Sequence, residues 1–409
     1  MAFKKLNISE WKQFHKIEIE FHERLTILTG ANASGKTTIL KLLANSFGLN
    51  HRECSTPAKD PVSGKFKYFT RFFKEPFQGE IPQIGFLEFD DEQKVALRIP
   101  ANNTPLYSIQ INQKGHEGFF IPSHRSEYEY KNVSQLPTRK KEKREAFYSV
   151  YTIMKEKANQ NQLQVPANYY IKETLLTWAI YGYGNPVVES EPEQLKYLNE
   201  FQKILQQLLP KSLGFKEIAI RKYEVVLITD SGDFMLDAVS GGLATLIDLA
   251  WLIYNFPSKN SFTVIIDEIE NHLYAVLQRQ ILPKLIASFP HVQFIVSTHN
   301  PLIIGSVKDS YVYALKYDEK NKIFSEYLDL VNKPKGAADI LREILGVSFT
   351  MPIWVEERLN EIVNKYSSTK LNNDDMDNMR KELTELGLAD LVPETIVKVV
   401  EKNGKTSKN

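Results

Sequence analysis

One stretch near the N-terminus has the residue types and spacing of a phosphate-binding loop. Residues 30–37 have the sequence GANASGKT, which matches G-x-x-x-x-G-K-[ST] at every fixed position. Glycine at both ends lets the backbone turn tightly and bring its N–H groups close to phosphate oxygens. In this pattern Lys36 neutralises the β and γ phosphates and Thr37 ligates Mg²⁺. The loop therefore predicts binding of a nucleoside triphosphate together with Mg²⁺.

The elements around the loop fit this interpretation. The apolar strand RLTILTG leads into it, and the amphipathic helix KTTILKLLANSFG follows, so its N-terminal dipole favours bound phosphate. The residues that we expect to contact the nucleotide here are Gly30, Asn32, Ala33, Ser34, Gly35, Lys36, Thr37 and Thr38.

A pair of adjacent acids follows a second apolar stretch. The run FTVIID ends in Asp267, which we expect to hold the Mg²⁺ hydration shell, and Glu268 stands next to it to orient or deprotonate the attacking water. Two acids after a strand also suit a helix N-terminus, but the phosphate loop favours the catalytic interpretation. The later run FIVSTHNP ends its strand near His299, a candidate hydrogen-bond partner for the γ-phosphate or the water, although a single histidine is more often structural.

A third element is the segment VSGGLATLIDLAWLIY, in which Ser240, Gly241 and Gly242 precede an apolar helix. A serine N-cap followed by two glycines exposes backbone N–H groups at a helix N-terminus, which makes a second position for an anion. The plain alternative is an ordinary capped helix after a turn. The order of the motifs along the chain decides against this alternative. The phosphate loop comes first, and it is followed by a long insert, S-G-G, the acid pair and the histidine.

In this order of motifs the chain resembles the ABC-type ATPases. There the S-G-G signature of one subunit closes over the γ-phosphate held by the phosphate loop of another. The resemblance therefore implies a head-to-tail homodimer, or a higher homo-oligomer, with ATP sandwiched at the interface, and it adds Ser240, Gly241 and Gly242 to the ATP-binding residues. GANASGKTT, DEIENHL and STHNPLII are similar to the SMC, RecF and OLD branch of that class. These motifs lie within residues 1–45 and 235–305.

Two features depart from that branch. Its members use a glutamine at the end of a subsheet strand to contact Mg²⁺ and sense the dimer, whereas FFIPSHRSEY has Ser123, His124 and Arg125 and no glutamine. The resemblance makes Arg125 the candidate for that contact. OLD-type nucleases also carry a C-terminal Toprim domain, whose carboxylates have no counterpart here. The acids of NNDDMDN, residues 372–378, precede a helical run and indicate a solvated helix cap, so we expect an ATPase without intrinsic nuclease activity.

Around these motifs the hydrophobic pattern predicts an α/β fold, which the resemblance makes an ABC-type ATPase head. Residues 1–125 would form an N-terminal ATPase lobe, with an antiparallel β subsheet made by the short alternating runs between about 65 and 122. A helical insert over 126–215 and a C-terminal ATPase lobe over 216–330 follow. Residues 331–409 would form a helical extension.

Composition limits the partners. The formal net charge of +1 gives no overall attraction to nucleic acid. A local basic cluster and the basic and aromatic segment GKFKYFTRFFK could nevertheless contact DNA or RNA. Charged runs are more often solvated faces, and the aromatic run alternates as a strand does. The members of the basic cluster are Lys131, Arg139, Lys140, Lys141, Lys143 and Arg144.

The sequence also indicates where the chain acts. It has no apolar N-terminal segment and no run of about 18 apolar residues that would span a bilayer. The single cysteine, Cys54, suits a reducing compartment. We therefore expect a cytoplasmic protein without membrane contact.

Several functions remain open at this stage. ATPases of this size without Toprim resemble the ATPase subunits of bacterial anti-phage defence modules, such as Septu-like, retron-linked and PARIS-like systems, where the ATPase holds or releases a separate effector. We expect an ATP-hydrolysing dimer that controls such an effector, a nuclease or a toxin. The alternative is an SMC/RecF-like DNA repair or recombination ATPase. A transporter subunit is disfavoured by the long insert and by Leu243 after S-G-G, and a non-hydrolysing scaffold by Glu268.

Overall fold

The chain folds into two compact units, Met1–Ile340 and Leu341–Asn409. The structure is a computed structural model. It describes residues 2–59, 63–69, 83–100, 104–111, 116–125, 127–158, 165–187, 189–330, 336–345, 353–366 and 373–389, and residues 392, 395, 396 and 399.

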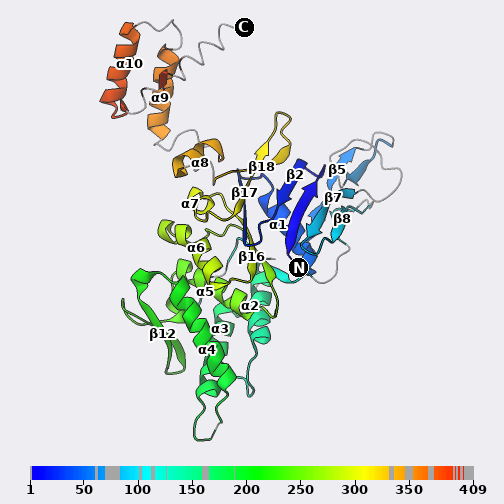
Figure 1. Ribbon diagram of the computed structural model, residues 1–409, viewed down its shortest axis with the longest axis vertical. Coiled ribbons are helices and arrows are strands. Elements are labelled where there is room, and N and C mark those ends of the chain that lie inside the picture. The colour runs from blue at the N-terminus through cyan, green and yellow to red at the C-terminus, as the bar shows by residue number, and fades with distance from the viewer. Residues whose placement is uncertain are drawn as a thin grey trace. The chain divides into compact units, whose positions relative to one another are not determined.

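A large mixed sheet forms the centre of the first unit (Figure 1). In order across the sheet, its strands are β10 (Gln110–Ile111), β8 (Lys94–Arg98), β7 (Gln83–Phe89), β1 (Phe3–Ile8), β2 (Phe14–Glu20), β18 (Ile323–Tyr327), β17 (Tyr311–Tyr317), β3 (Leu25–Gly30), β16 (Val292–Ser297), β15 (Phe262–Ile266) and β11 (Gly118–Ile121). From β17 to β11 all neighbours are parallel, whereas β1, β2, β7, β8 and β10 pair antiparallel. The predicted α/β class is therefore confirmed.

The parallel half of the sheet brings the sequence motifs together. β3 and β16 are buried along their whole length, as expected for strands covered on both faces, and α1 (Lys36–Ala44) packs across β3, β15 and β16. Because these three strands are parallel, their carboxyl ends meet at one edge of the sheet. The loop after β3, the acids after β15 and the histidine after β16 consequently gather at that edge.

Three strands of this range, β6 (Phe66–Phe69), β9 (Leu106–Tyr107) and β11, lie outside the predicted antiparallel group. The pattern between about 65 and 122 predicts one antiparallel group, but β11 pairs in parallel with β15, at the edge of the sheet opposite to β10. Its residues 119–121 are all buried, so this run belongs to the covered parallel half. β6 pairs with β5 (Thr56–Lys59) in a separate two-stranded sheet, and β4 (Glu53–Cys54) pairs with β9. Residues 70–74 of the basic and aromatic segment lie outside the described residues.

A helical region follows β11 in the chain, while the bounds of the helical insert stay a prediction. It contains α2 (Lys143–Ala158), α3 (Ala167–Tyr183) and α4 (Pro192–Leu208), which pack with α5 (Gly241–Asn255) in the lower part of Figure 1. Buried aromatic rings hold this bundle together, and Trp178 of α3 stacks on Trp251 of α5 with ring centroids 5.3 Å apart. Beside α3 and α4 lies a three-stranded sheet of β12 (Phe215–Arg221), β13 (Glu224–Thr229) and β14 (Phe234–Met235). The helix α5 is thereby anchored in the insert along much of its length.

The remaining helices follow the acid pair. α6 (Ala275–Ser288) joins β15 to β16, and α7 (Pro301–Ile304) follows β16. α8 (Ala337–Glu343) spans the boundary of the two units. The second unit contains α9 (Ile353–Tyr366) and α10 (Asn373–Glu385), and Asp374 and Asp375 stand in the first turn of α10, where the sequence predicts a helix cap. The described residues include no helix with the length and apolar character that crossing a membrane requires.

Candidate nucleotide-binding site

The loop of residues 30–37 joins β3 to α1 and requires glycine at two positions. Gly35 has a φ of +85°, and a Cβ there would lie 2.4 Å from Cζ of the Phe14 ring. Gly30 has a φ of +137°, and a Cβ there would lie 2.5 Å from the carbonyl oxygen of Leu315. Any side chain would therefore clash at both positions and strain the backbone. The loop thus packs closely against β2 at Gly35 and against β17 at Gly30.

Lys36 lies inside the loop. Its amine donates hydrogen bonds to the carbonyl oxygens of Gly30 at 2.9 Å and Ala31 at 3.0 Å. Burial lowers the pKa of Lys36, while the carboxylates of residues 267–270 act in the opposite direction. The hydroxyl of Ser34 is also buried here and has no hydrogen-bond partner among the described residues. A cation and an unused hydroxyl thus lie in the loop, as a phosphate ligand would require.

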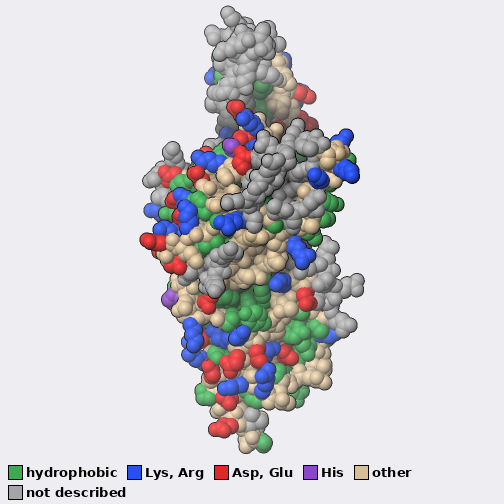
Figure 2. Space-filling view, turned by 90° about the vertical axis from the view of Figure 1, so that its right-hand side faces the viewer, with side chains coloured by type: hydrophobic (Ala, Val, Ile, Leu, Met, Phe, Trp, Pro, Cys, Tyr) green, Lys and Arg blue, Asp and Glu red, His purple; other side chains and the backbone are tan. Residues whose placement is uncertain are grey.

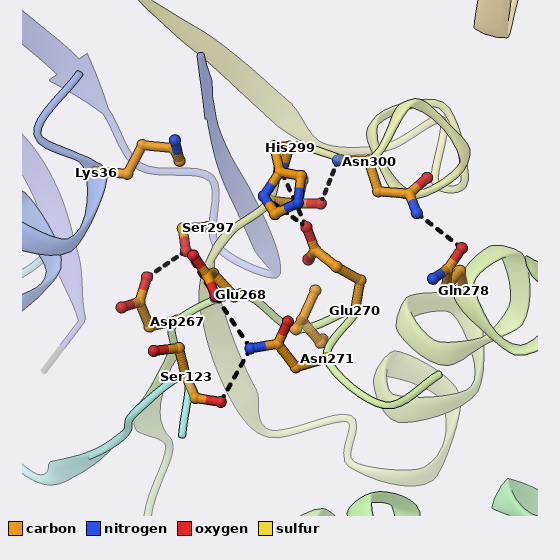
Figure 3. A network of polar contacts seen from close by, with 12 residues as sticks. Lys36, Ser123, Asp267, Glu268, Glu270, Asn271, Gln278, Ser297, His299 and Asn300 are labelled. Carbon is orange, nitrogen blue, oxygen red and sulfur yellow. Dashed lines mark hydrogen bonds and ion pairs between the residues drawn. The ribbon is translucent and has the colours of Figure 1, made fainter. Parts of the chain in front are cut away.

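Two hydroxyl groups donate to Asp267, one from the phosphate loop and one from the end of β16. Thr37 Oγ1 donates to Asp267 Oδ2 at 2.8 Å, and Ser297 Oγ donates to Asp267 Oδ1 at 2.5 Å. The same Ser297 oxygen accepts the backbone N–H of Glu268 at 2.8 Å (Figure 3). The predicted Thr37 and Asp267 therefore lie together. Ser297 was missed by the sequence analysis, although it stands just before His299 at the end of the same strand.

Glu268 is held from two sides. Its φ of +46° is uncommon for a residue other than glycine. Asn271 Nδ2 donates to Glu268 Oε2 and to the carbonyl oxygen of Ser123, at 3.0 Å each. The guanidinium of Arg125 donates to the carbonyl oxygens of Glu268 at 3.3 Å and of Ile269 and Asn271 at 3.4 Å. Arg125 thus contacts the backbone of the acid loop, residues 267–274 between β15 and α6. Its contact with a nucleotide stays a prediction.

His299 lies at the same edge of the sheet, against a carboxylate that the sequence analysis missed. Glu270 Oε1 accepts the backbone N–H of His299 at 3.0 Å and lies 3.3 Å from the ring Nδ1 (Figure 3). Glu270 is only 6% exposed, and its Oε2 has no hydrogen-bond partner among the described groups. The ring of His299 is half exposed. Glu270 stands in the motif DEIENHL, three residues after Asp267, and its place in that motif was the available signal for it.

The S-G-G segment lies at the start of α5, as the sequence predicts. Ser240 is the N-cap residue and is exposed, without a side-chain capping bond. The two glycines pack against His272, because a Cβ on Gly242 would lie 2.9 Å from its carbonyl oxygen and one on Gly241 would lie 3.6 Å from its Nδ1. No hydrogen bond in the described part of the chain joins residues 240–242 to the phosphate loop. The segment therefore contacts the acid loop of its own chain and leaves its N-terminal end open.

The predicted basic cluster is partly neutralised within the chain. Lys141 is buried and pairs with Glu173, and Arg139 pairs with Glu145, with N–O distances of 2.6 Å in both pairs. Lys143 lies 3.5 Å from the centroid of an aromatic ring. On the face shown in Figure 2, Lys and Arg side chains are interspersed with Asp and Glu. Direct contact with DNA or RNA stays a prediction.

Comparison with known proteins places these motifs in a family. Residues 25–305, more than half of the chain, match the AAA_21 family, described as "AAA domain, putative AbiEii toxin, Type IV TA system". The matched range contains the phosphate loop, the S-G-G segment, the acid pair and His299.

Several individual proteins are similar. The Septu protein PtuA of Bacillus thuringiensis is 20% identical over 372 residues, 87% of each chain. That of Bacillus mycoides (strain KBAB4) is 24% identical over 410 residues, which cover 93% of this chain and only 49% of the relative. The Retron Ec83 probable ATPase of Escherichia coli is 28% identical over 182 residues, 42% of this chain and 29% of the relative.

Among solved structures, an SMC head bound to the C-winged helix domain of ScpA has 17% identity and a TM-score of 0.46, with 81% of this chain and 100% of that chain covered. The similarity to Septu and retron proteins confirms the resemblance that the motifs indicate. The chain belongs to the AAA_21 family and is an ATPase related to Septu PtuA and to the retron ATPases.

Proposed function

We propose that this protein binds ATP with Mg²⁺ and hydrolyses it, and that two copies enclose the nucleotides head to tail. The observation that carries the proposal is the hydrogen bond of 2.8 Å between Thr37 and Asp267. It joins the phosphate loop to the acid pair, so that a triphosphate in the loop and the carboxylate of Glu268 would face one another. Lys36 would neutralise the β and γ phosphates.

The side chains present suit Mg²⁺. Thr37 and Asp267 offer a hydroxyl and a carboxylate, the hard oxygen donors that Mg²⁺ accepts, and these two residues would hold it. Bound Mg²⁺ supplies positive charge to the phosphate oxygens. Glu268 would orient or deprotonate the attacking water, because Asn271 fixes its carboxylate at the site. His299, held by Glu270, would contact the γ-phosphate or the water.

The S-G-G segment supports the dimer. Residues 240–242 have no hydrogen bond to the phosphate loop of their own chain in the described residues, and they present the exposed N-terminal end of α5. A helix N-terminus attracts phosphate through its free N–H groups and its dipole. A second copy would therefore complete the site by placing this end over the γ-phosphate. Higher homo-oligomers could be built from such dimers.

The relatives support a regulatory role. Similarity to Septu PtuA and to a retron ATPase favours control of a separate effector, a nuclease or a toxin, in bacterial anti-phage defence. The alternative, a DNA repair or recombination ATPase of SMC/RecF type, has weaker support, because Arg139 and Lys141 of the basic cluster pair within the chain.

Mixing two inactive variants tests the shared site. Lys36→Ala disables the phosphate loop, and Ser240→Glu places a negative charge where the γ-phosphate of the partner would lie. A head-to-tail dimer of one copy of each retains one intact site. An equal mixture should then recover about one quarter of wild-type phosphate release, because half of the dimers are mixed and each has one working site of two. A mixture as inactive as its components would contradict the shared site.

The effector is tested separately. Glu268→Gln protein, tagged and purified from its native host with ATP and Mg²⁺, should carry a stoichiometric nuclease or toxin that the Lys36→Ala protein lacks. Purification of a homodimer bound to DNA would favour the repair ATPase instead.

A further inference from the structure

The S-G-G segment has few contacts of its own side chains to hold it in place. Ser240 is exposed and makes no side-chain capping bond, and the two residues after it are glycines. In the chain before it lies the short turn η3 (Leu236–Ala238), which ends two residues before Ser240. The placement of the segment therefore depends on the elements at its two ends, α5 and η3.

Asp237 of η3 is held by two side chains of α3. Lys172 Nζ donates to its Oδ2 and Asn168 Nδ2 donates to its Oδ1, at 2.5 Å each. Asn168 and Lys172 stand about one turn apart on the same face of α3, so both reach the same carboxylate. The side chains of Lys172 and Asp237 are only 1% and 3% exposed, and Asn168 is fully buried. Charged hydrogen bonds away from water are strong, so these bonds fix η3 against α3.

The same lysine has partners on two further segments. Its ammonium lies 2.7 Å from Oε2 of Glu224, at the start of β13, and donates to the carbonyl oxygen of Lys131 at 3.0 Å. The three donors of the ammonium thus have three partners. Of these partners only Asp237 is close to the S-G-G segment in the chain, three residues before Ser240.

We propose that Lys172 and Asn168, acting through Asp237, position the S-G-G segment to meet the nucleotide bound by a partner copy. Val239, between η3 and Ser240, has extended backbone, so a shift of Asp237 is passed to Ser240 through a short, straight stretch of chain. A misplacement of about 1 Å at a reacting centre can cost about 100-fold in rate. The inference rests on the proposed function, because it concerns the half of the shared site that one copy supplies to the other.

Asp237→Asn tests the link with little change of shape. Its amide can accept from only one of the two donors of α3, because its NH₂ group would face the other. Lys172 keeps Glu224 as a counter-charge, so no charge loses its only partner. Phosphate release should fall by about tenfold or more, while the affinity for a fluorescent ATP analogue stays within about threefold, because the phosphate loop is unchanged.

Glu224→Gln is the matched control. It removes the other carboxylate charge from the same lysine and leaves the bond of Lys172 to Asp237 in place. Phosphate release should stay within about twofold of wild type. A loss as large as that of Asp237→Asn would show that the charges only stabilise the packing of α3.

Mixing experiments identify which half of the shared site is affected. Lys36→Ala supplies an intact S-G-G segment, so an equal mixture with Asp237→Asn should recover about one quarter of wild-type phosphate release. Ser240→Glu supplies none, so its mixture with Asp237→Asn should release no more phosphate than Asp237→Asn alone. General damage to the fold would prevent recovery in both mixtures, and an intact S-G-G segment would allow it in both. Either outcome would contradict the positioning role.

Hydrogen exchange of the full-length protein without nucleotide tests the same link independently of ATP hydrolysis. The N–H of Val239 donates to the carbonyl oxygen of Leu236 at 3.4 Å, and that of Ala244 donates to the carbonyl oxygen of Ser240 at 2.9 Å. Both should exchange about tenfold or more faster in Asp237→Asn than in the control variant. Equal exchange in the two variants would refute the link between α3 and the S-G-G segment.

The two measurements separate this inference from the proposed function. If Lys36→Ala and Ser240→Glu do not complement each other while Asp237→Asn accelerates exchange, the shared site is refuted and the link to α3 stands. If they complement each other and Asp237→Asn behaves as the wild type in both assays, the link is refuted and the shared site stands.

Discussion

Replacing Glu268 by glutamine is the most informative single change in the site. The side-chain oxygen that accepts from Asn271 at 3.0 Å is retained in the amide, and the backbone bond to Ser297 at 2.8 Å is untouched. The variant therefore keeps the shape of the acid loop and loses only the charge and the proton acceptor. Because Asp267 and Thr37 are unchanged, ATP and Mg²⁺ should still bind.

The size of the effect follows from the role of the carboxylate. A positioned general base contributes about 10²- to 10⁴-fold to rate, which is about 3 to 5 kcal/mol of barrier. Phosphate release in a single turnover should slow by that factor, while the affinity for a fluorescent ATP analogue stays within about threefold. ATP-dependent dimers should accumulate, which sedimentation in the presence of ATP and Mg²⁺ would measure.

The matched control is Glu217→Gln, which removes the same charge from an exposed position of β12 outside the site. It should release phosphate at the wild-type rate. Equal turnover by Glu268→Gln and wild type would remove Glu268 from catalysis. A loss of ATP affinity as large as the loss of rate would show instead that the carboxylate supports the site structurally.

Four further changes test other parts of the structure. Lys36→Ala should weaken ATP binding by about 10- to 100-fold, because the phosphate loses a charged hydrogen bond that contributes about 1.5 to 3 kcal/mol. An equilibrium binding measurement tests this, and full ATP affinity would contradict the assignment of the phosphate loop. Gly48→Ala should destabilise the fold by about 1 to 2 kcal/mol, because Gly48 has a positive φ and open space around it. Gly35→Ala should destabilise the fold by more, because Gly35 also has a positive φ and its Cβ would meet the ring of Phe14. Urea unfolding of the two variants compares their free energies of unfolding. Ser297→Ala should lower the unfolding free energy by about 1 to 3 kcal/mol, because the Glu268 N–H and the Asp267 carboxylate both lose a hydrogen-bond partner. It should also reduce Mg²⁺-dependent ATP affinity. An unchanged unfolding free energy would show that another group replaces the hydroxyl. Burial raises the pKa of Asp248, on α5, to about 7 in the folded protein, above its unfolded value. Its contribution to stability is therefore full below about pH 4 and is lost as pH rises through about 7. The difference in unfolding free energy between about pH 5 and about pH 8, measured with urea, should be smaller in Asp248→Asn than in wild type.

The parts of the site that the sequence predicts are those defined by local spacing. Residues 30–37 need only the chain between them to make a phosphate loop, and Asp267 and Glu268 follow an apolar strand whose end is visible in the sequence. Parallel pairing then brings these segments together, because the carboxyl ends of β3 and β15 lie at the same edge.

The parts that it misses depend on pairing between distant strands. Ile266 stands opposite Val296 in the β15–β16 register, so Ser297 comes to lie beside Asp267, and nothing near Ser297 in the sequence announces this. The run of residues 118–121 likewise contains no signal of its partner, and only the pairing with β15 places it in the parallel half. Because β11 pairs there, Arg125, which follows it, comes within hydrogen-bond distance of the backbone of the acid loop.

The position of β3 in the sheet has a consequence for how the protein is made. Its neighbours on either side are β16 and β17, and Leu25 pairs with Phe294 while Thr26 pairs with Tyr311. During synthesis, β3 therefore cannot pair on either edge until β16 and β17 have been made, which is after most of the chain. Such late pairing slows folding and leaves an unpaired, aggregation-prone strand edge exposed until then. A nascent chain that stops before β16 would hold the complete phosphate-loop sequence and still lack both neighbouring strands that hold β3 in place.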